Sequence, residues 1–415
     1  MNTGFASKKY DLFKILFTGL TLFALSCISP FEPDYQGKTN LLVVDGSLIK
    51  GLDKQVINIS RSASILLPEY EYAKYQPEEN CQVKIMDDSG NEFIFTEESK
   101  GKYVANIDDA LLKYDTNYKL MFSTSSGETY ESGYQRLLKT PPVDSIYCIK
   151  EFRYSPEYNR ENIEGLQFYV DLAAPGDVSK YYKWQIEKTW EIHASHKING
   201  IWDGSNIILF DSPSDSLYYC WDTKTATGIY TASTVNLSQN VIKKIPLHYE
   251  LSTSKALIFK YCATVRQFAL NKEAYDYWHT KEIEMTESGD IYTNQPYQVK
   301  SNIYNTINPE ENVLGFFWVS SCTFKRLFVE KPFNNGIEDN NQCSRATTCT
   351  SIFNENNLDF LYAFVKNARQ FPKPPPVFFY IEIVEFSGIC FNFSKDECVD
   401  CRVRGGTIQR PDFWE

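Results

Sequence analysis

Cysteine is the residue type whose number and spacing most suggest chemistry in this chain of 415 residues, which contains 11 cysteines. Cys398 and Cys401 have the Cys-x-x-Cys spacing that zinc sites and redox-active thiols use. A zinc site needs four ligands, but the sequence has no second pair with this spacing and no histidine nearby. A redox pair normally opens a helix after a strand, whereas Arg-Val-Arg-Gly-Gly follows here. The spacing therefore favours a structural role for both cysteines.

Other patterns typical of catalysis or metal binding are weak or missing. His193 and His196 come closest to a metal pair, but positions three apart on a strand face opposite sides of a sheet. Asp87, Asp88 and Asn91 fit a hairpin turn better than a calcium loop. The sequence has no phosphate-binding loop, Gly-x-Ser-x-Gly elbow or His-Glu-x-x-His motif. It therefore predicts no cofactor and no metal, and no catalytic residue can be picked out.

The N-terminus has the layout of a secretory signal. Three lysines precede an apolar stretch over residues 15–25, which is shorter than the roughly 20 residues of a membrane-spanning helix. The boundary between Ser26 and Cys27 resembles the bacterial lipoprotein signal, in which the cysteine is acylated and becomes the first mature residue. We therefore expect residues 1–26 to be a signal peptide and Cys27 to carry the lipid. Ordinary cleavage near Ser26, with Cys27 as a plain thiol, is the alternative.

Export makes disulfides the leading hypothesis for the ten cysteines other than Cys27. Their pairing cannot be deduced from the sequence, and five bridges is the upper bound. Some of them are close enough in the chain to close short loops. The disulfide candidates are Cys343, Cys349, Cys390, Cys398 and Cys401.

The charge balance excludes a large class of partners. The chain has 42 basic and 53 acidic residues, which gives a net charge of −11. A protein that follows nucleic-acid phosphates needs a basic face, so we expect no nucleic-acid partner. Anionic lipid surfaces are disfavoured for the same reason. The hydrophobic content of 43% is that of an ordinary globular protein and argues against a disordered chain.

Hydrophobic alternation predicts a mainly β protein. After a tether over residues 27–37, residues 38–139 are expected to form an immunoglobulin-like or fibronectin-like sandwich. Consecutive prolines make residues 140–144 the best hinge, because they favour an extended backbone. A larger, mostly antiparallel β domain with one or two helices and a cysteine-containing C-terminal segment is expected over residues 145–415.

Particular elements follow from the same patterns. In the first domain, strands are expected at residues 41–44, 55–60, 82–86, 92–95, 101–105, 118–123 and 127–132. In the second domain, strands are expected at residues 166–172, 181–186, 256–261, 312–319 and 377–383. Helix-forming residues with an apolar stripe predict a helix over residues 271–288.

Aromatic residues make up 15% of the chain, and three of them fall in a predicted loop. Tyr70, Tyr72 and Tyr75 lie between prolines and do not alternate as strand residues would. Exposed tyrosines suit recognition, because they combine a large rigid surface with a polar tip. They are candidate binding residues; packing of the loop against its own domain is the equally weighted alternative.

Several segments together resemble one family. The lipoprotein signal is followed, in this order, by Leu42–Ile49, Gly127–Ser132, Thr140–Ile146, Leu314–Phe317 and a C-terminal run from Cys398 to Trp414. These segments resemble the Bacteroidota lipoproteins classed as domain of unknown function 4249. The resemblance implies an outer-membrane lipoprotein whose gene often accompanies a TonB-dependent receptor, and it implies no catalytic residues. Glu32 and Asp34 also resemble the acidic tract that directs such lipoproteins to the cell surface.

The expected function is therefore that of a non-catalytic lipoprotein on the outer-membrane surface, an accessory of a TonB-dependent receptor in nutrient binding and import. This hypothesis predicts exposed aromatic or apolar surface. A secreted hydrolase with two carboxylates is one alternative, and it predicts a cleft with two acidic side chains of strongly perturbed pKa. A structural envelope lipoprotein is the other alternative, and it predicts neither feature.

Overall fold

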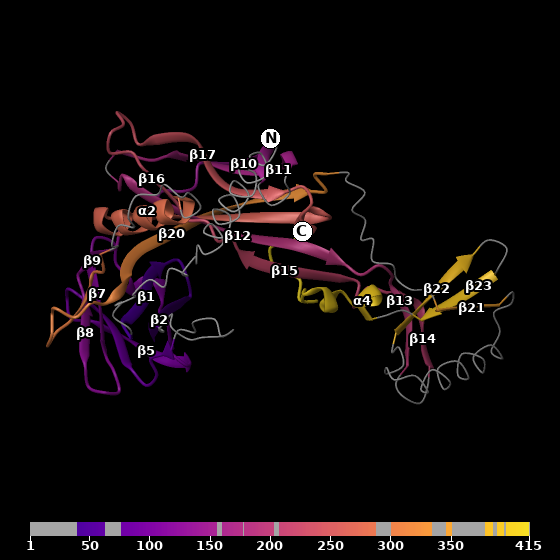
Figure 1. Ribbon diagram of the computed structural model, residues 1–415, viewed down its shortest axis with the longest axis horizontal. Helices are drawn as coiled ribbons and strands as arrows, with labels where there is room; N and C mark the ends of the chain where they lie inside the picture. The colour runs from indigo at the N-terminus through magenta and orange to yellow at the C-terminus, as the bar shows by residue number, and fades with distance from the viewer. Residues whose placement is uncertain are drawn as a thin grey trace, which may run out of the picture.

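The computed structural model describes residues 40–62, 76–155, 160–176, 178–202, 207–287, 300–333, 346–350, 378–384, 388–393 and 396–414. Over these residues the protein is mainly β, as the alternation predicts, with sheets of 15, three and five strands. The N-terminal strands and the five-stranded sheet lie at opposite ends of the long axis, and long central strands run between them (Figure 1). Across these same ranges, no helix has the length and apolar character needed to cross a membrane.

The N-terminal lobe contains all seven strands that were expected there, together with two short pairings. Alternation of buried and accessible residues is clearest in β7, because one face of this strand packs on the core and the other meets solvent. The strands of the lobe are β1 (Leu42–Lys50), β2 (Lys54–Arg61), β3 (Gln76–Pro77), β4 (Gln82–Asp87), β5 (Glu92–Ser99), β6 (Lys102–Asn106), β7 (Asn117–Ser123), β8 (Thr129–Ser132) and β9 (Gln135–Arg136).

The β4–β5 connection confirms the hairpin expected at residues 87–91. One carboxylate oxygen of Asp87 accepts hydrogen bonds from the backbone N–H groups of Ser89 (2.9 Å) and Asn91 (2.8 Å). The other oxygen accepts from the Asn91 side chain at 2.7 Å. These polar residues therefore stabilise the turn itself, as Asx-type turns do.

Two packed sheets form the central region. The three-stranded sheet contains β10 (Ser145–Ser155), β11 (Arg160–Ala173) and β17 (Val241–Leu251). It packs on the central part of the large sheet, and Phe168, Trp184 and Tyr261 are completely or almost completely buried in that core. The central part of the large sheet contains β12 (Tyr181–His193), β15 (Tyr219–Thr225), β16 (Tyr230–Ser233), β18 (Lys260–Leu270) and β20 (Leu314–Glu330). The remaining strand, β19 (Ile303–Asn305), pairs with β8 and belongs to the N-terminal lobe.

One expected strand of this region is wrong. Residues 256–261 were predicted to be extended, but Lys255–Leu257 forms a short 3-10 helix, η3, and β18 begins only at Lys260. The hydroxyl of Ser254 accepts a hydrogen bond from the Ala256 N–H and caps η3. Local capping therefore outweighs the β propensity of the apolar residues that follow. The expected helix over residues 271–288 is confirmed as α2 (Lys272–Glu287).

A parallel pairing joins the N-terminal lobe to the central region. Strand β1 runs antiparallel to β2 on one side and parallel to β20 on the other. Gly315 makes this contact possible: its φ is +94°, and a Cβ atom there would lie 1.8 Å from the Val44 carbonyl oxygen. Strand β20 also supplies Phe317 and Val319 to the core of the N-terminal lobe. The lobe is therefore completed by residues from the far half of the chain.

The predicted hinge at residues 140–144 lies against this same strand. Thr140 is 3% exposed; its N–H donates to the Ser321 hydroxyl (2.8 Å), and its own hydroxyl donates to the Ser321 carbonyl oxygen (2.6 Å). These bonds fix one end of the segment to β20. The division into two domains at this segment stays a prediction, since the large sheet contains strands from both sides of it.

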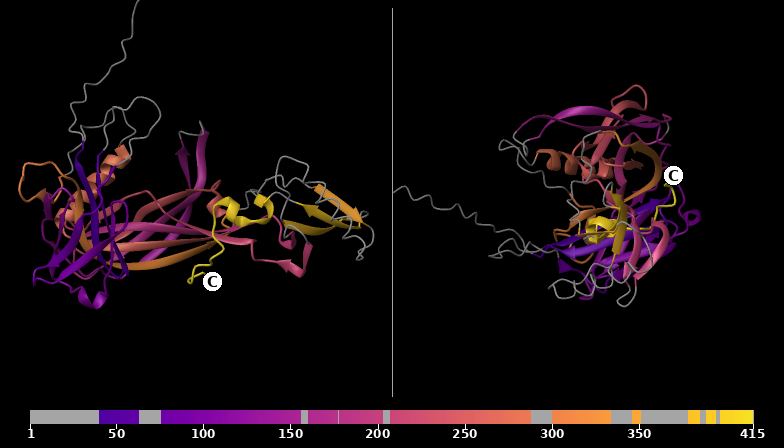
Figure 2. Two further views of the ribbon diagram at one scale, coloured as in Figure 1. Left: turned by 90° about the horizontal axis from the view of Figure 1, so that it is seen from below. Right: turned by 90° about the vertical axis from the view of Figure 1, so that its right-hand side faces the viewer.

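The five-stranded sheet contains β13 (Ile198–Trp202), β14 (Ile207–Ser214), β21 (Ala346–Thr350), β22 (Phe378–Val384) and β23 (Gly388–Phe393), and it is followed by the short helices α4 (Asp396–Val399) and η4 (Cys401–Arg404). From below, these elements extend beyond the end of the central strands (Figure 2). In the β21–β23 ladder the backbone of Cys349 lies directly opposite that of Cys390.

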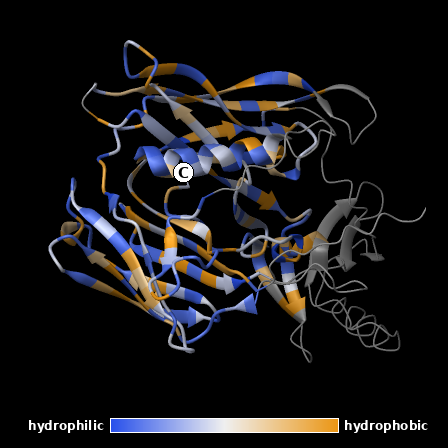
Figure 3. Cartoon of the chain, turned by 60° about the vertical axis from the view of Figure 1, so that its left-hand side comes forward, coloured by the Kyte–Doolittle hydropathy of each residue, from blue (hydrophilic) through white to orange (hydrophobic). Residues whose placement is uncertain are grey.

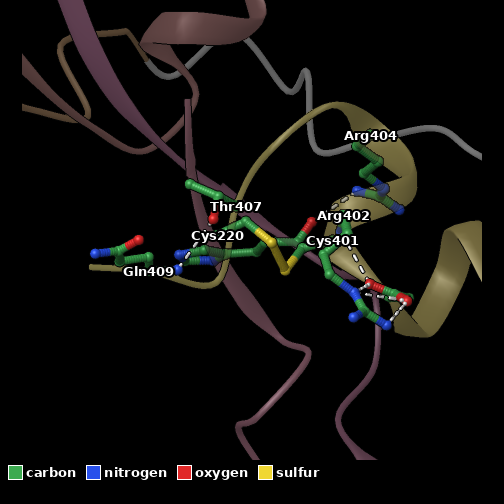
Figure 4. Close-up of a disulfide and its surroundings, with 8 residues drawn as sticks. Cys220, Cys401, Arg402, Arg404, Thr407 and Gln409 are labelled. Atoms are coloured by element: carbon green, nitrogen blue, oxygen red, sulfur yellow. Dashed lines mark hydrogen bonds and ion pairs between the residues drawn. A yellow bond between two sulfur atoms is a disulfide. The ribbon is translucent and has the colours of Figure 1, made fainter. Parts of the chain in front are cut away.

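A disulfide between Cys220 and Cys401 ties the C-terminal segment to β15 (Figure 4). Next to the bridge, Trp221 and Thr407 exchange two backbone hydrogen bonds of 2.8 Å. Arg404 donates to the His193 carbonyl oxygen at 2.8 Å, which adds a contact to the end of β12. The C-terminal segment is therefore held by covalent and hydrogen bonds at the same place.

Gly315→Ala tests the close approach of β1 and β20. We expect a loss of about 3 kcal/mol or more in the free energy of unfolding, because a Cβ atom would strain the backbone and push the Val44 carbonyl out of the ladder. The measurement is urea-induced unfolding followed by circular dichroism. Gly127→Ala is the matched control, since Gly127 has a φ of +88° and a Cβ atom there would meet nothing within 4 Å. Equal effects of the two substitutions would contradict this account.

Cys220→Ala tests the disulfide. The bridge closes a loop over a sequence separation of 181, so its removal is expected to lower the free energy of unfolding by about 2–5 kcal/mol. It should also make the chain cleavable by trypsin at Arg402 and Arg404. Cys148→Ala removes a free, half-buried thiol and is the control. Protection of the C-terminal segment in Cys220→Ala, equal to that in the control, would show that the bridge does not hold it.

Candidate functional site

A cluster of charged and aromatic side chains lies where α2 crosses the central strands on the face opposite the three-stranded sheet. We call it the Lys183 recess and define it by Asp45, Lys183, Phe268, Trp278 and Trp318. Strand register brings four of these residues onto one face: Lys183 on β12 lies opposite Phe268 on β18, and Trp318 on β20 lies opposite Ser47, two residues after Asp45 on β1. Helix α2 adds Trp278 from above.

Helix α2 is positioned by its first turn. It begins after Asn271, whose side-chain oxygen accepts a hydrogen bond from the Ala274 N–H at 2.8 Å. Ala274 is 1% exposed, and its small side chain lets the helix pack closely on the sheet. The Asn271 amide also donates to Gln135 at 2.7 Å, which ties the helix to the N-terminal lobe. Figure 3 shows α2 across the sheet, with hydrophilic and hydrophobic residues along its length.

Aromatic side chains of α2 cover the Lys183 recess on the side away from the sheet. The ring of Tyr277 stacks on Phe316 with a centroid distance of 4.6 Å. Trp278 meets Trp318 edge to face at 5.8 Å. These arrangements are the favoured ones for aromatic pairs and hold the rings rigidly. The recess therefore has a preformed aromatic wall.

Three rings surround the Lys183 ammonium group. Its Nζ lies 3.8 Å from the ring centroid of Trp278, 4.6 Å from that of Trp318 and 5.5 Å from that of Phe268. Cation–π attraction stabilises an ammonium group in such a setting. The residue is only 8% exposed, and burial lowers the pKa of Lys183 to about 8. The fold thus retains a buried cation at a cost in stability.

Asp45 carries the opposite charge in the recess. Its side chain is exposed, yet the surrounding protein raises the pKa of Asp45 by desolvation, while Lys183 and a hydrogen bond from Asn58 act in the other direction. A carboxyl group that keeps accessible surface, and is nevertheless desolvated by the protein around it, lies in a concave part of the surface. The two charges influence each other, but Asp45 and Lys183 form no direct ion pair.

Most of the site residues predicted from the sequence lie elsewhere. Cys27, the loop tyrosines Tyr70, Tyr72 and Tyr75, and Cys343 lie outside the described residues. For Cys349 and Cys390 the structure describes the backbone only. None of the remaining candidates belongs to the Lys183 recess.

The C-terminal cysteines have the structural role that their spacing favoured. Cys401 bonds to Cys220, and Cys398 is also disulfide-bonded. Both are completely buried. The sequence allowed Cys401 to close a short loop with a nearby cysteine of the C-terminal segment. Its bond to Cys220 excludes that loop. Cys81, Cys148, Cys262 and Cys322 are free thiols, so the upper bound of five bridges is not reached.

Sequence reasoning missed the recess, although two signals point to it. Lys183 interrupts an aromatic run at the start of its strand, Tyr181-Tyr182-Lys183-Trp184. Asp45 is the single charged residue in the first half of β1. The lysine is the more informative of the two, because charges are seldom buried without a reason. The aromatic partners come from distant elements and could not be assigned to either charge.

Lys183→Met tests the cost of the buried cation. The folded-state pKa of Lys183 is about 8 and its ordinary value is 10.5, so at pH 7 the folded state bears the cost of burying the charge. We expect Lys183→Met to be more stable at pH 7 by up to about 3 kcal/mol. From pH 8 to about 10.5 the folded wild type releases this proton first, so its stability relative to the variant should rise.

Urea unfolding of both proteins between pH 6.5 and 9.5 measures this difference. Lys224→Met is the control: Lys224 also lies over a tryptophan ring, Trp190, but its side chain is 65% exposed. Its effect should be small and independent of pH. A Lys183→Met protein less stable than the wild type at pH 7 would mean that the aromatic cage stabilises the charge more than burial penalises it.

Comparison with known proteins assigns the chain to a family. No curated protein matches the chain. Residues 28–326, which include the N-terminal lobe, α2 and most of β20, match a family model described as Domain of unknown function (DUF4249). All five residues of the Lys183 recess fall within this match. The chain belongs to the DUF4249 family.

Proposed function

We propose that this protein is a non-catalytic lipoprotein of the outer-membrane surface that binds a small ligand as an accessory of a TonB-dependent receptor. The observation that carries the binding part is the Lys183 recess. It combines two opposite charges with rigid aromatic walls. A few fixed polar groups set in an apolar wall are the usual composition of a small-molecule site.

The charges of the recess favour binding over hydrolysis. A carboxylate-dependent hydrolase needs two acidic groups facing one bond. In the described part of the chain, Asp45 is the only carboxyl group with a raised pKa, and the charged group that acts on it is the Lys183 ammonium. A purely structural role is also less favoured, because a well-packed apolar residue at position 183 would serve the core better.

The membrane location and the receptor partner rest on the sequence. The signal with Cys27 and the family resemblance support both. A surface suited to a protein partner is found on β10, one of the two outer strands of the three-stranded sheet. Ile149 and Phe152 on this strand are 40% and 65% exposed. Exposed apolar side chains on an edge strand are typical of contact sites.

Co-purification from the native outer membrane tests the proposal. A tagged copy of the protein is solubilised in mild detergent, and its partners are identified by mass spectrometry. We expect a β-barrel receptor in stoichiometric amount. Recovery of the protein alone would remove the accessory role.

Two surface variants make the result specific. Phe152→Asp should reduce recovery of the receptor several-fold, because a charge on the β10 edge opposes an apolar contact. Ile94→Asp changes a side chain that is 71% exposed on the N-terminal lobe and is the matched control. Equal recovery with both variants would place the receptor contact away from β10.

A further inference from the structure

Two hydrogen-bond donors in the Lys183 recess have no acceptor. Among the residues that the structure describes, none accepts a hydrogen bond from Lys183 or forms an ion pair with it. The indole Nε1 of Trp278 is buried and likewise has no hydrogen-bond partner. The two donors are neighbours, because the lysine Nζ lies over the Trp278 indole, 3.8 Å from its ring centroid.

Such a pair of donors indicates a missing acceptor. A buried donor without a partner costs about 1–3 kcal/mol, and a charged one costs more. Native proteins keep few such groups, and those that persist need an explanation. A ligand carboxylate would supply two acceptor oxygens and a negative charge beside the Lys183 ammonium. The position of the donors therefore favours an anionic group on the ligand.

Asp45 restricts the ligand further. A simple anion would gain from Lys183 but would be repelled by the Asp45 carboxylate, which lies on the same face of the sheet and interacts electrostatically with Lys183. A ligand with an ammonium group beside its carboxylate would satisfy both charges. Asp45 is exposed and forms no ion pair with any described residue, so its carboxylate is available to such a group.

We infer that the Lys183 recess binds a small zwitterion of the amino-acid class. Its carboxylate accepts hydrogen bonds from Lys183 Nζ and Trp278 Nε1, and its ammonium group pairs with Asp45. The aromatic wall formed by Trp278 and Trp318 excludes water from the carboxylate end. This inference rests on the binding role proposed above and names its ligand class.

Titration of the purified protein with free L-amino acids, one at a time, tests the inference. Calorimetry reports binding, and so does the intrinsic tryptophan fluorescence, to which Trp278 and Trp318 contribute two of the seven tryptophans. We expect saturable binding of at least one amino acid. Its N-acetyl and its C-terminal amide forms should each bind at least ten-fold more weakly, since each form lacks one of the two charges. Equal binding of a blocked form, or no saturable binding of any amino acid, would overturn the inference and leave a recess filled by water.

Four variants assign the binding to the recess. Lys183→Met and Asp45→Asn should each weaken binding at least ten-fold, and Trp278→Phe should weaken it several-fold, because it removes one donor and keeps an aromatic ring. Lys224→Met, outside the recess, should leave the affinity unchanged. A Lys183→Met protein that is folded by circular dichroism and binds as the wild type does would overturn the assignment.

The two proposals can fail separately. A receptor that co-purifies with a protein that binds no amino acid would contradict only the ligand class. Amino-acid binding by a protein that co-purifies with no receptor would support the ligand class and contradict the accessory role.

Discussion

The structure depends on the parallel contact between β1 and β20. Strand β20 is 17 residues long; its first half pairs with β1 and its second half with β18. A single strand thus contributes to the core of the N-terminal lobe, to the core of the central region and to the floor of the Lys183 recess. Gly315 permits the close approach at the start of the ladder. Without that contact, Asp45 and Lys183 would not share a face.

The fold was predictable where the determining interactions are local. Alternation of apolar and polar residues predicts the strands of the N-terminal lobe. The turn-forming residues around Asp87 predict the β4–β5 hairpin. The composition of residues 271–288 gave α2. The parallel β1–β20 ladder and the bond between Cys220 and Cys401 join segments separated by much of the chain, and no local pattern encodes them. The strand expected at residues 256–261 failed because a capped turn competes there.

The candidate site was less predictable than the fold. Its charges are single residues in ordinary strands. The burial of Lys183 and the closeness of the aromatic rings are seen only in the tertiary structure. Trp278 lies within the predicted helix 271–288, where an aromatic residue indicates a packing role. Its second role, as a donor without an acceptor beside Lys183, requires the position of the helix over the sheet. Sites of this kind break the local rules that make the surrounding fold predictable.

The chain order of β1 and β20 has a consequence for folding during synthesis. Strand β1 is among the first elements to emerge, whereas its parallel partner emerges after most of the chain. Until then one edge of β1 stays unpaired, and the core of the lobe lacks Phe317 and Val319. Contacts between segments so far apart form slowly, and unpaired edges are prone to intermolecular pairing. The edge of β1 is therefore the part of the incomplete chain most open to intermolecular pairing until β20 is available.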